Sequence, residues 1–254
     1  MKDKVIIVTG GSSGMGKAMA TRFAADGAKV VITGRSLERL EEAKKDIEQE
    51  EGQVLCIDMD VRDPERVQYT VDETIKTFGK IDGLVNNAAG NFICAAEDLS
   101  YNGWNSVIDI VLNGTFYCSQ AVGKEWIKRG HKGRILNIVA TYSWTAGAGV
   151  IHSASAKAGV LAMTRTLAVE WGSKYGITVN AIAPGPIDNT GGAKKLTLSE
   201  DARQQTLDSV PVGRMGQPEE IAGLARFLFS DEAAYINGDC ITMDGGQWLN
   251  RNPF

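Results

Sequence analysis

Short, mainly apolar runs alternate along the chain with longer stretches in which apolar residues recur at helical spacing. Uninterrupted apolar runs are typical of strands that are buried on both faces of a parallel sheet. The predicted strands cover residues 5–9, 29–33, 53–57, 83–85, 134–139, 177–182 and 240–243. The predicted helices cover residues 14–26, 37–50, 64–78, 103–129, 153–174 and 217–230. This alternation predicts an α/β fold: a single doubly wound, Rossmann-type parallel sheet of about seven strands with helices on both faces.

One stretch departs from the alternation. Composition gives no break that would mark a domain boundary, so residues 1–254 are expected to form one domain. Residues 187–215 carry a polar, glycine-containing loop followed by a short polar helical pattern. Long irregular insertions in compact domains are usually lids or disordered loops. Because this one follows the carboxyl end of the sixth strand, we expect a substrate lid.

Composition and charge narrow the class of protein. Apolar residues make up 43% and charged residues 23% of the 254 residues, which is ordinary globular usage. The formal net charge of −4 disfavours a general nucleic-acid binder. No apolar run of about 20 residues is available to span a membrane, and the amino-terminal residues resemble no signal peptide, so a cytoplasmic protein is expected. The cysteines form no paired motif, which predicts reduced thiols and no metal site: Cys56, Cys94, Cys118 and Cys240.

A glycine-rich turn follows the first predicted strand and opens the first predicted helix. Glycines at such a turn allow the backbone to approach a pyrophosphate, and the positive end of the helix faces the phosphates. The sequence therefore predicts a dinucleotide site, with contacts from Gly10, Ser12, Ser13, Gly14, Met15 and Gly16.

The end of the second predicted strand distinguishes between the two nicotinamide dinucleotides. NAD-binding proteins usually place an acidic residue there to bind the ribose 2′-hydroxyl. This chain has Arg35 instead, and a guanidinium makes charge-assisted hydrogen bonds to a 2′-phosphate. NADP(H) is therefore the expected cofactor, the alternative being that Arg35 is a solvated loop residue.

Further motifs follow along the chain: Asp60-Val61, Asn86-Asn87-Ala88, Lys157, Pro184-Gly185 and Asp244-Gly245-Gly246. Together with the glycine-rich turn, they resemble the short-chain dehydrogenase/reductase family over nearly the whole chain. The resemblance implies that Asp60 and Val61 contact adenine and that Asn87 and Ala88, in the segment 86–88, lie near its ribose. It also implies that the nicotinamide carboxamide is met by the segment Pro184, Gly185, Pro186 and Ile187. Asn189 stands where the family usually has threonine, and Thr190 follows it.

The family's usual catalytic pattern is largely missing. That pattern is Tyr-x-x-x-Lys with a serine thirteen residues before the tyrosine. Lys157 is present, but Ser153 stands in the tyrosine position and Ala140 in the serine position. Val111 stands where the family has a helix asparagine. Either the site is inactive, leaving an NADP-sensing module, or the chemistry has changed.

New polar residues favour changed chemistry. Asn91 and Tyr142 follow the fourth and fifth predicted strands, at the crevice where doubly wound sheets bind ligands. Segments 86–92, 109–114 and 153–159 also resemble the NADPH-dependent 2,4-dienoyl-CoA reductases. This resemblance implies catalytic roles for Tyr142, Asn91, Ser153 and Lys157.

The implied reaction explains why the hydrogen-bond donors have moved. Hydride adds to C5 of a conjugated dienoyl thioester, and the negative charge develops on the distant thioester oxygen. Tyr142 and Asn91 are suitable donors to that dienolate oxygen. The expected activity is NADPH-dependent reduction of 2,4-dienoyl-CoA to 3-enoyl-CoA in unsaturated fatty acid oxidation. A carbonyl reductase that acts on another acyl thioester or ketone, with Tyr142 as the acid, is the enzymatic alternative.

Further roles follow from the resemblance. Lys157 is expected to bind the nicotinamide ribose hydroxyls, and Ser153 to lie near the nicotinamide or to cap its helix. Arg62 is a candidate for a CoA phosphate contact, with a surface ion pair as the alternative. Phe92 and Ser100 are weaker candidates for contacts with the acyl chain or the pantetheine arm.

Three other expectations remain. Trp144 and the 187–215 segment are candidates for lining an acyl tunnel. His152 has no metal-ligand spacing with His131; because it is next to Ser153, a role in the site is the alternative interpretation. The apolar helices at 103–129 and 153–174 pair between subunits in the family, so a homotetramer is expected.

Overall fold

The computed structural model describes residues 1–48, 52–191 and 199–250. Within them, all strands form one parallel sheet in the order β3-β2-β1-β4-β5-β6-β7, which confirms the predicted Rossmann-type architecture. The strands are β1 (Val5–Thr9), β2 (Lys29–Gly34), β3 (Gln53–Asp58), β4 (Gly83–Asn86), β5 (Arg134–Ile138), β6 (Thr178–Pro184) and β7 (Cys240–Met243). The chain reverses its direction of winding between β1 and β4, where doubly wound sheets open a ligand crevice.

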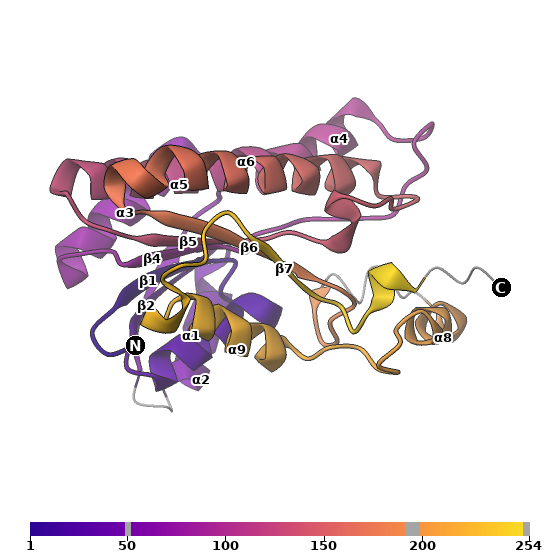
Figure 1. Cartoon of the computed structure of the whole chain (residues 1–254), viewed down its shortest axis with the longest axis horizontal. Helices are drawn as coiled ribbons and strands as arrows, with labels where there is room; N and C mark the ends of the chain where they lie inside the picture. The colour runs from indigo at the N-terminus through magenta and orange to yellow at the C-terminus, as the bar shows by residue number, and fades with distance from the viewer. Residues whose placement is uncertain (49–51, 192–198, 251–254) are drawn as a thin grey trace.

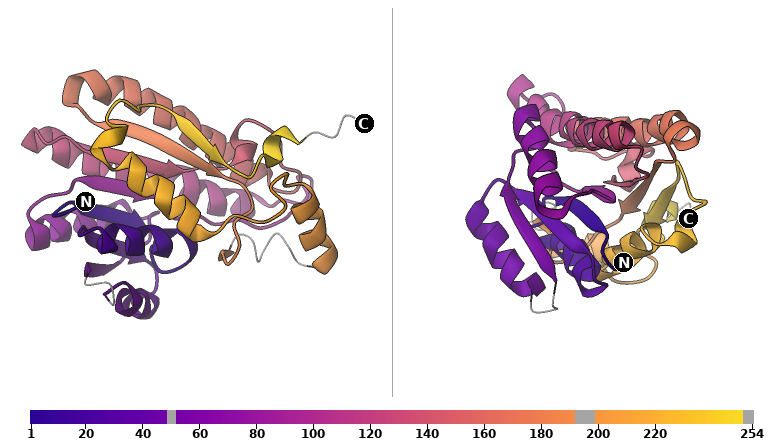
Figure 2. Two further views of the ribbon diagram at one scale, coloured as in Figure 1. Left: turned by 60° about the horizontal axis from the view of Figure 1, so that its bottom comes forward. Right: turned by 90° about the vertical axis from the view of Figure 1, so that its left-hand side faces the viewer.

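Helices cover both faces of this sheet (Figure 1). One face carries α1 (Gly14–Ala25), α2 (Leu37–Glu48) and α9 (Pro218–Leu228). The other carries α3 (Pro64–Phe78), α4 (Tyr101–Ile108), α5 (Gly114–Arg129) and α6 (Ile151–Tyr175). The views in Figure 2 show the same layering from two further directions. No helix among the described residues is long and apolar enough to cross a membrane.

The apolar runs of the sequence are explained by burial on both faces of the sheet. Every residue of β1 is buried, and its side chains alternate between two cores. Ile6 and Val8 pack in the core beneath α1 and α9, whereas Ile7 packs with Val31 in the core beneath α3 and α5. Because neither side of the strand meets water, no polar alternation marks it in the sequence.

The predicted continuous helix over residues 103–129 is wrong in detail. The chain forms α4, then a wide π-helical turn over Asp109–Asn113, and then α5. The amide of Asn113 donates to Asp109 Oδ1 at 2.8 Å across this turn. Gly114 follows and packs so closely on Val61 that an added Cβ would lie 2.6 Å from a methyl carbon. Helical periodicity does not distinguish such a turn from regular α-helix.

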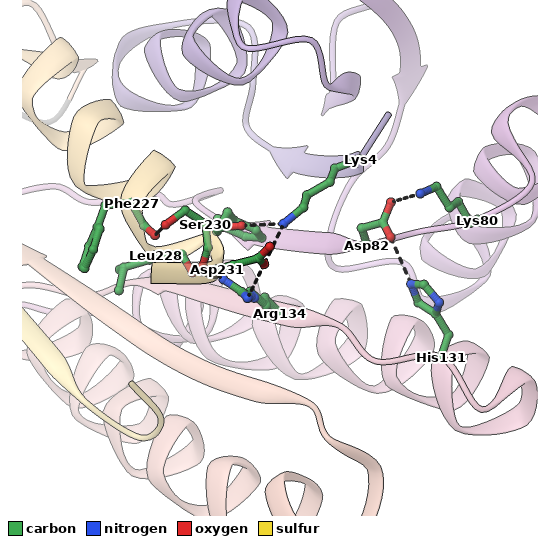
Figure 3. Close-up of polar contacts among 10 residues, drawn as sticks. Lys4, Lys80, Asp82, His131, Arg134, Phe227, Leu228, Ser230 and Asp231 are labelled. Atoms are coloured by element: carbon green, nitrogen blue, oxygen red, sulfur yellow. Dashed lines mark hydrogen bonds and ion pairs between the residues drawn. The ribbon is translucent and has the colours of Figure 1, made fainter. Parts of the chain in front are cut away.

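Polar contacts join the amino-terminal ends of the strands, at the edge opposite the crevice (Figure 3). Lys4, just before β1, donates to the carbonyl of Phe229 at 2.9 Å. Asp82, just before β4, accepts from the Val5 backbone at 2.8 Å and pairs with Lys80 at 3.0 Å and His131 at 3.1 Å. Arg134, the first residue of β5, binds the end of α9 through carbonyl oxygens and Asp231. We call this set the amino-edge cluster.

The 187–215 segment leaves β6 and returns to it. Ile187 forms an isolated parallel bridge with Gly216. Between them the predicted polar helix is present as α8 (Glu200–Asp208), which lies at the same end of the molecule as the last described residues (Figure 1). Residues 192–198 of the segment lie outside the described residues. Its function as a lid stays a prediction.

Candidate active site

The turn between β1 and α1 has the geometry that a pyrophosphate site needs. Gly10 and Gly14 adopt left-handed backbone angles, with φ of +64° and +53°. At Gly16 an added Cβ would lie 2.3 Å from the Gly10 carbonyl oxygen, so only glycine fits. Ser13 caps α1 without a side-chain hydrogen bond, and no acidic residue occupies the first turn. The positive end of the helix is therefore available to an anion.

Thr9 and Asn87 fix this turn to the neighbouring strand. Thr9 Oγ1 accepts hydrogen bonds from the backbone of Asn87 and of Ala88, each at 3.0 Å. The Asn87 amide donates back to the carbonyls of Thr9 and Gly10 at 3.0 and 3.2 Å. Asn87 and Ala88, expected near the adenine ribose, thus also position the glycine turn.

A hollow of about 210 Å³ lies beside the glycine turn. Its lining combines Ser12 and Ser13 with two cations, Lys17 and Arg39, and two acids, Glu42 and Asp46. Arg35 is exposed at the end of β2, and an added Cβ on its neighbour Gly34 would lie 3.8 Å from Ser12 Oγ. Lys17 and Arg39 were not among the predicted site residues, although Arg39 follows Arg35 by four positions in the sequence.

Asp60 and Arg62, predicted to bind different parts of the ligands, bind each other. Arg62 Nε donates to Asp60 Oδ1 at 3.0 Å, and a second guanidinium nitrogen completes the pair. This bonding from Arg62 holds the pKa of the Asp60 carboxyl below its usual value, with a smaller electrostatic contribution from Arg35. Arg35 therefore lies near the expected adenine end. Arg62 forms the ion pair that was its alternative interpretation.

The segment after β6 lies over the amino end of α1. Gly185 packs against Asp244, where an added Cβ would lie 2.6 Å from the Asp244 Cβ. Asn189 is exposed and has a left-handed φ of 55°. Thr190 is buried and donates to the Ile187 carbonyl at 2.9 Å; an added Cβ on Gly14 would lie 3.5 Å from its methyl carbon. Thr190, one position later than usual, therefore occupies the place next to the glycine turn.

Tyr142 and Ser153 meet at the carboxyl end of β5. Tyr142 lies in the short helical turn Thr141–Ser143, and its hydroxyl is 3.1 Å from Ser153 Oγ. Ser153 lies in the first turn of α6, which begins at Ile151, and does not cap the helix. Burial raises the pKa of Tyr142, partly opposed by the Ser153 hydrogen bond, so the phenol is protonated at neutral pH and able to donate.

Lys157 lies one turn further along α6 and is buried. Its ammonium donates to the Ile138 carbonyl at the end of β5. Burial lowers the pKa of Lys157 to about 8. A strongly perturbed cation at the crevice of such a sheet is typical of a functional site.

Asn91 follows β4 in the loop that leads to α4. Its Oδ1 accepts a hydrogen bond from the Phe92 backbone at 2.9 Å. The side-chain orientation is thereby fixed with the amide NH₂ as the group that can donate. Asn91 is half-buried, so part of the residue remains exposed.

A buried polar chain supports the crevice from below. Asn86 donates to Ser119 Oγ at 3.0 Å and to Asn137 Oδ1 at 2.8 Å, and Asn137 donates to Thr164 at 2.9 Å. These contacts connect β4 and β5 to α5 and α6. Asn86 belongs to the segment 86–88 that the family resemblance singled out, whereas Asn137, Ser119 and Thr164 were not predicted.

The predicted substrate contacts are more scattered. Phe92 is half-buried and packs edge-on against His152 with ring centroids 4.5 Å apart. Ser100 is exposed and caps α4 through a 3.1 Å hydrogen bond from Gly103. Trp144, which follows the Thr141–Ser143 turn, packs edge-on against Trp248 with ring centroids 5.8 Å apart, and both residues remain 37% exposed.

A crevice with a glycine turn, a buried lysine and a serine-tyrosine pair defines a nucleotide-dependent oxidoreductase site. A family model described as "Enoyl-(Acyl carrier protein) reductase" matches residues 10–247. A crystal structure of a short chain dehydrogenase from Bacillus anthracis is 66% identical and covers 99% of both chains with a TM-score of 0.91. The chain belongs to the short-chain dehydrogenase/reductase family.

The chain is also similar to named relatives within this family. A Bacillus subtilis protein named "Probable 2,4-dienoyl-CoA reductase [(2E)-enoyl-CoA-producing]" is 65% identical over the full length of both chains. A zebrafish (Danio rerio) "Peroxisomal 2,4-dienoyl-CoA reductase [(3E)-enoyl-CoA-producing]" is 43% identical over 98% of this chain and 83% of its own. An actinorhodin polyketide ketoreductase solved with NADPH is 29% identical, covers 96% of this chain and 97% of its own, and has a TM-score of 0.92.

Proposed function

We propose that this chain reduces 2,4-dienoyl-CoA thioesters to 3-enoyl-CoA thioesters with NADPH, in the breakdown of unsaturated fatty acids. The 3.1 Å contact between Tyr142 and Ser153 carries the proposal. Serine replaces the family's usual tyrosine on α6, yet a phenol still reaches the crevice, from the turn after β5. A relocated phenol suits a substrate whose developing charge lies far from the carbon that receives hydride.

The residues around the glycine turn fit the phosphate end of NADPH. The tight approach at Gly16 and the uncapped end of α1 suit the pyrophosphate. Arg35 would bind the 2′-phosphate, with Ser12 and Arg39 beside it. Pro184 to Ile187 would meet the carboxamide, and Lys157 would turn its ammonium to the nicotinamide ribose.

The protein's part in the chemistry is electrostatic. When bound, NADPH supplies a hydride to C5 of the dienoyl chain. Tyr142 Oη and the Asn91 amide then donate to the thioester oxygen, on which the negative charge accumulates. Preorganised donors of this kind each lower the barrier by about 2.7–4 kcal/mol. Ser153 orients the phenol. Lys157 need not supply a proton, because the product is protonated on carbon by water.

The position of the final proton decides the product. Protonation of the dienolate at C2 leaves the double bond between C3 and C4, whereas protonation at C4 leaves it between C2 and C3. The names of the two relatives differ on this point. We favour C2, next to the oxygen that Tyr142 and Asn91 hold, with water as the proton source. Turnover in D₂O followed by NMR of the product would place deuterium at C2 if this is correct and at C4 if the product is the 2-enoyl thioester.

A substrate screen tests the reaction class. We expect NADPH oxidation with a 2,4-dienoyl-CoA and none with a 3-oxoacyl-CoA. Turnover of the oxo substrate alone would instead identify a carbonyl reductase that uses Tyr142 as its acid. Tight NADPH binding without turnover of any thioester in the screen would identify an NADP-sensing module.

We also propose a homotetramer. Phe116 on α5 and Val169 on α6 are large apolar residues that are 42% and 78% exposed in the single chain. Pairing of these helices between subunits would bury them. Light scattering should give four times the mass of the chain, and a stable monomer would exclude the proposal.

A further inference from the structure

His152 is a fully buried polar residue to which the proposed reaction gives no role. It is the second residue of α6, and its side chain has no exposed surface. The two proposed oxyanion donors lie on two loops, and the His152 ring contacts the residue next to one donor and a residue whose hydroxyl meets the other. One loop follows β4 and carries Asn91; the other follows β5 and carries Tyr142.

On one side His152 binds the backbone that carries Ser153. Its Nδ1 accepts a hydrogen bond from the Ser153 N–H at 2.8 Å. This N–H is in the first helical turn, where the backbone has no partner within the helix, and Val150 at the helix start offers no side-chain cap. The imidazole therefore fixes the backbone of Ser153, whose hydroxyl in turn meets Tyr142.

On the other side the ring packs against Phe92. The ring centroids are 4.5 Å apart and the planes nearly perpendicular, at 88°. The backbone N–H of Phe92 donates to the Asn91 side chain, so the position of Phe92 determines where the Asn91 amide lies. One imidazole thus contacts the supports of both donors.

The remaining ring nitrogen argues against a role as a simple helix cap or core filler. Because Nδ1 accepts, the neutral ring carries its proton on Nε2. That atom is enclosed and has no hydrogen-bond partner among the described residues. An unpaired buried donor costs stability, which an apolar side chain or a simple capping residue at Val150 would avoid. The imidazole is better explained by its contacts with the Ser153 backbone and with the Phe92 ring.

We infer that His152 is a positioning residue: it fixes the separation of Tyr142 and Asn91 by holding Ser153 on one side and Phe92 on the other. The inference rests on the proposed function, in which both donors bind one oxygen. Its two contacts are separable by substitution. His152→Phe keeps a flat ring against Phe92 but removes the acceptor for Ser153. His152→Asn keeps an acceptor at the Nδ1 position but removes the ring.

Double-mutant kinetics test the two arms. Each variant should lower kcat about tenfold, with KM and NADPH affinity changed less than about twofold. His152→Phe should cost little more in a Tyr142→Phe background but its full factor in an Asn91→Ala background. His152→Asn should show the reverse pattern. Equal factors in every background, or unchanged kcat in both variants, would reject positioning.

A second readout needs no substrate. The ¹³Cζ NMR signal of Tyr142 reports the hydrogen bond of its phenol, and Ser153→Ala supplies the reference for a broken contact. His152→Phe should move the signal towards that reference, and His152→Asn should not. If His152→Phe fails to fold, His152→Gln, which carries its acceptor further from the Ser153 N–H, replaces it. If the Tyr142 signal does not move in His152→Phe, the inference is overturned. If the signal moves but the unsubstituted protein does not reduce dienoyl-CoA, only the proposed function is overturned.

Discussion

The hydroxyl of Tyr142 lies 3.1 Å from Ser153 Oγ, although the two residues come from different elements and only one of them stands in the family's usual catalytic position. The pair therefore keeps a phenol in the crevice while changing the direction from which it arrives. A phenol in this position can donate to an oxygen that lies far from the carbon receiving hydride.

Tyr142→Phe should lower kcat by about 10²–10³ while KM changes little, because the hydroxyl is used mainly in the transition state. Steady-state kinetics with a 2,4-dienoyl-CoA provide the measurement. NADPH affinity, from fluorescence titration, is the control and should be preserved. Near-normal turnover would contradict this role of Tyr142 and leave Ser153 and Lys157 as the candidate catalytic residues.

Asn91→Ala should lower kcat by a similar factor, because the amide NH₂ is the second donor to the same oxygen. The double variant with Tyr142→Phe should lose less than the product of the two single effects. A strictly multiplicative loss would show that the two side chains act on different atoms. Asn113→Ala, which removes an amide that binds Asp109 on the π-helical turn, is the matched control.

Arg35→Asp should weaken NADPH binding at least tenfold while changing NADH binding much less. A charge-assisted hydrogen bond contributes about 1.5–3 kcal/mol, and this substitution also introduces repulsion. Isothermal titration with both cofactors measures the effect. Lys128→Asp, the same charge change at an exposed position of α5, is the control. An unaltered preference for NADPH would assign the 2′-phosphate to Lys17 or Arg39.

Activity should fall as pH rises through about 8, the lowered pKa of Lys157, because the protonated ammonium makes a charge-assisted hydrogen bond to the cofactor ribose that is stronger than the bond from the neutral amine. The profile of kcat/KM for NADPH reports this group in the free enzyme. Lys157→Met should have low activity without this descending limb. Stability should move oppositely: between about pH 8 and 10.5 the unfolded chain binds more protons than the native one, so the free energy of unfolding rises with pH.

Much of the fold could be predicted because burial on both sheet faces leaves a direct record in sequence. β1 has four consecutive apolar residues for this reason, and it pairs with β2 in parallel. The π-helical turn before Gly114 could not be predicted, since it depends on how closely Val61 approaches from another element.

The site was predictable where chemistry depends on local spacing. The glycine turn and Lys157 are in this class. The direction of a loop side chain is not: Tyr142 reaches Ser153 only because the turn at Thr141–Ser143 folds against α6. The hollow lined by Lys17 and Arg39 likewise requires α1 and α2 to pack together.

The amino-edge cluster has an evolutionary consequence. Lys4, Asp82 and Arg134 fasten the strands at the end away from the crevice, where no ligand is expected. The contacts that fasten this end of the sheet therefore do not involve the proposed catalytic side chains at its carboxyl end. A lineage with this arrangement can exchange one catalytic set for another, tyrosine for serine on α6 among them, while these strand contacts persist.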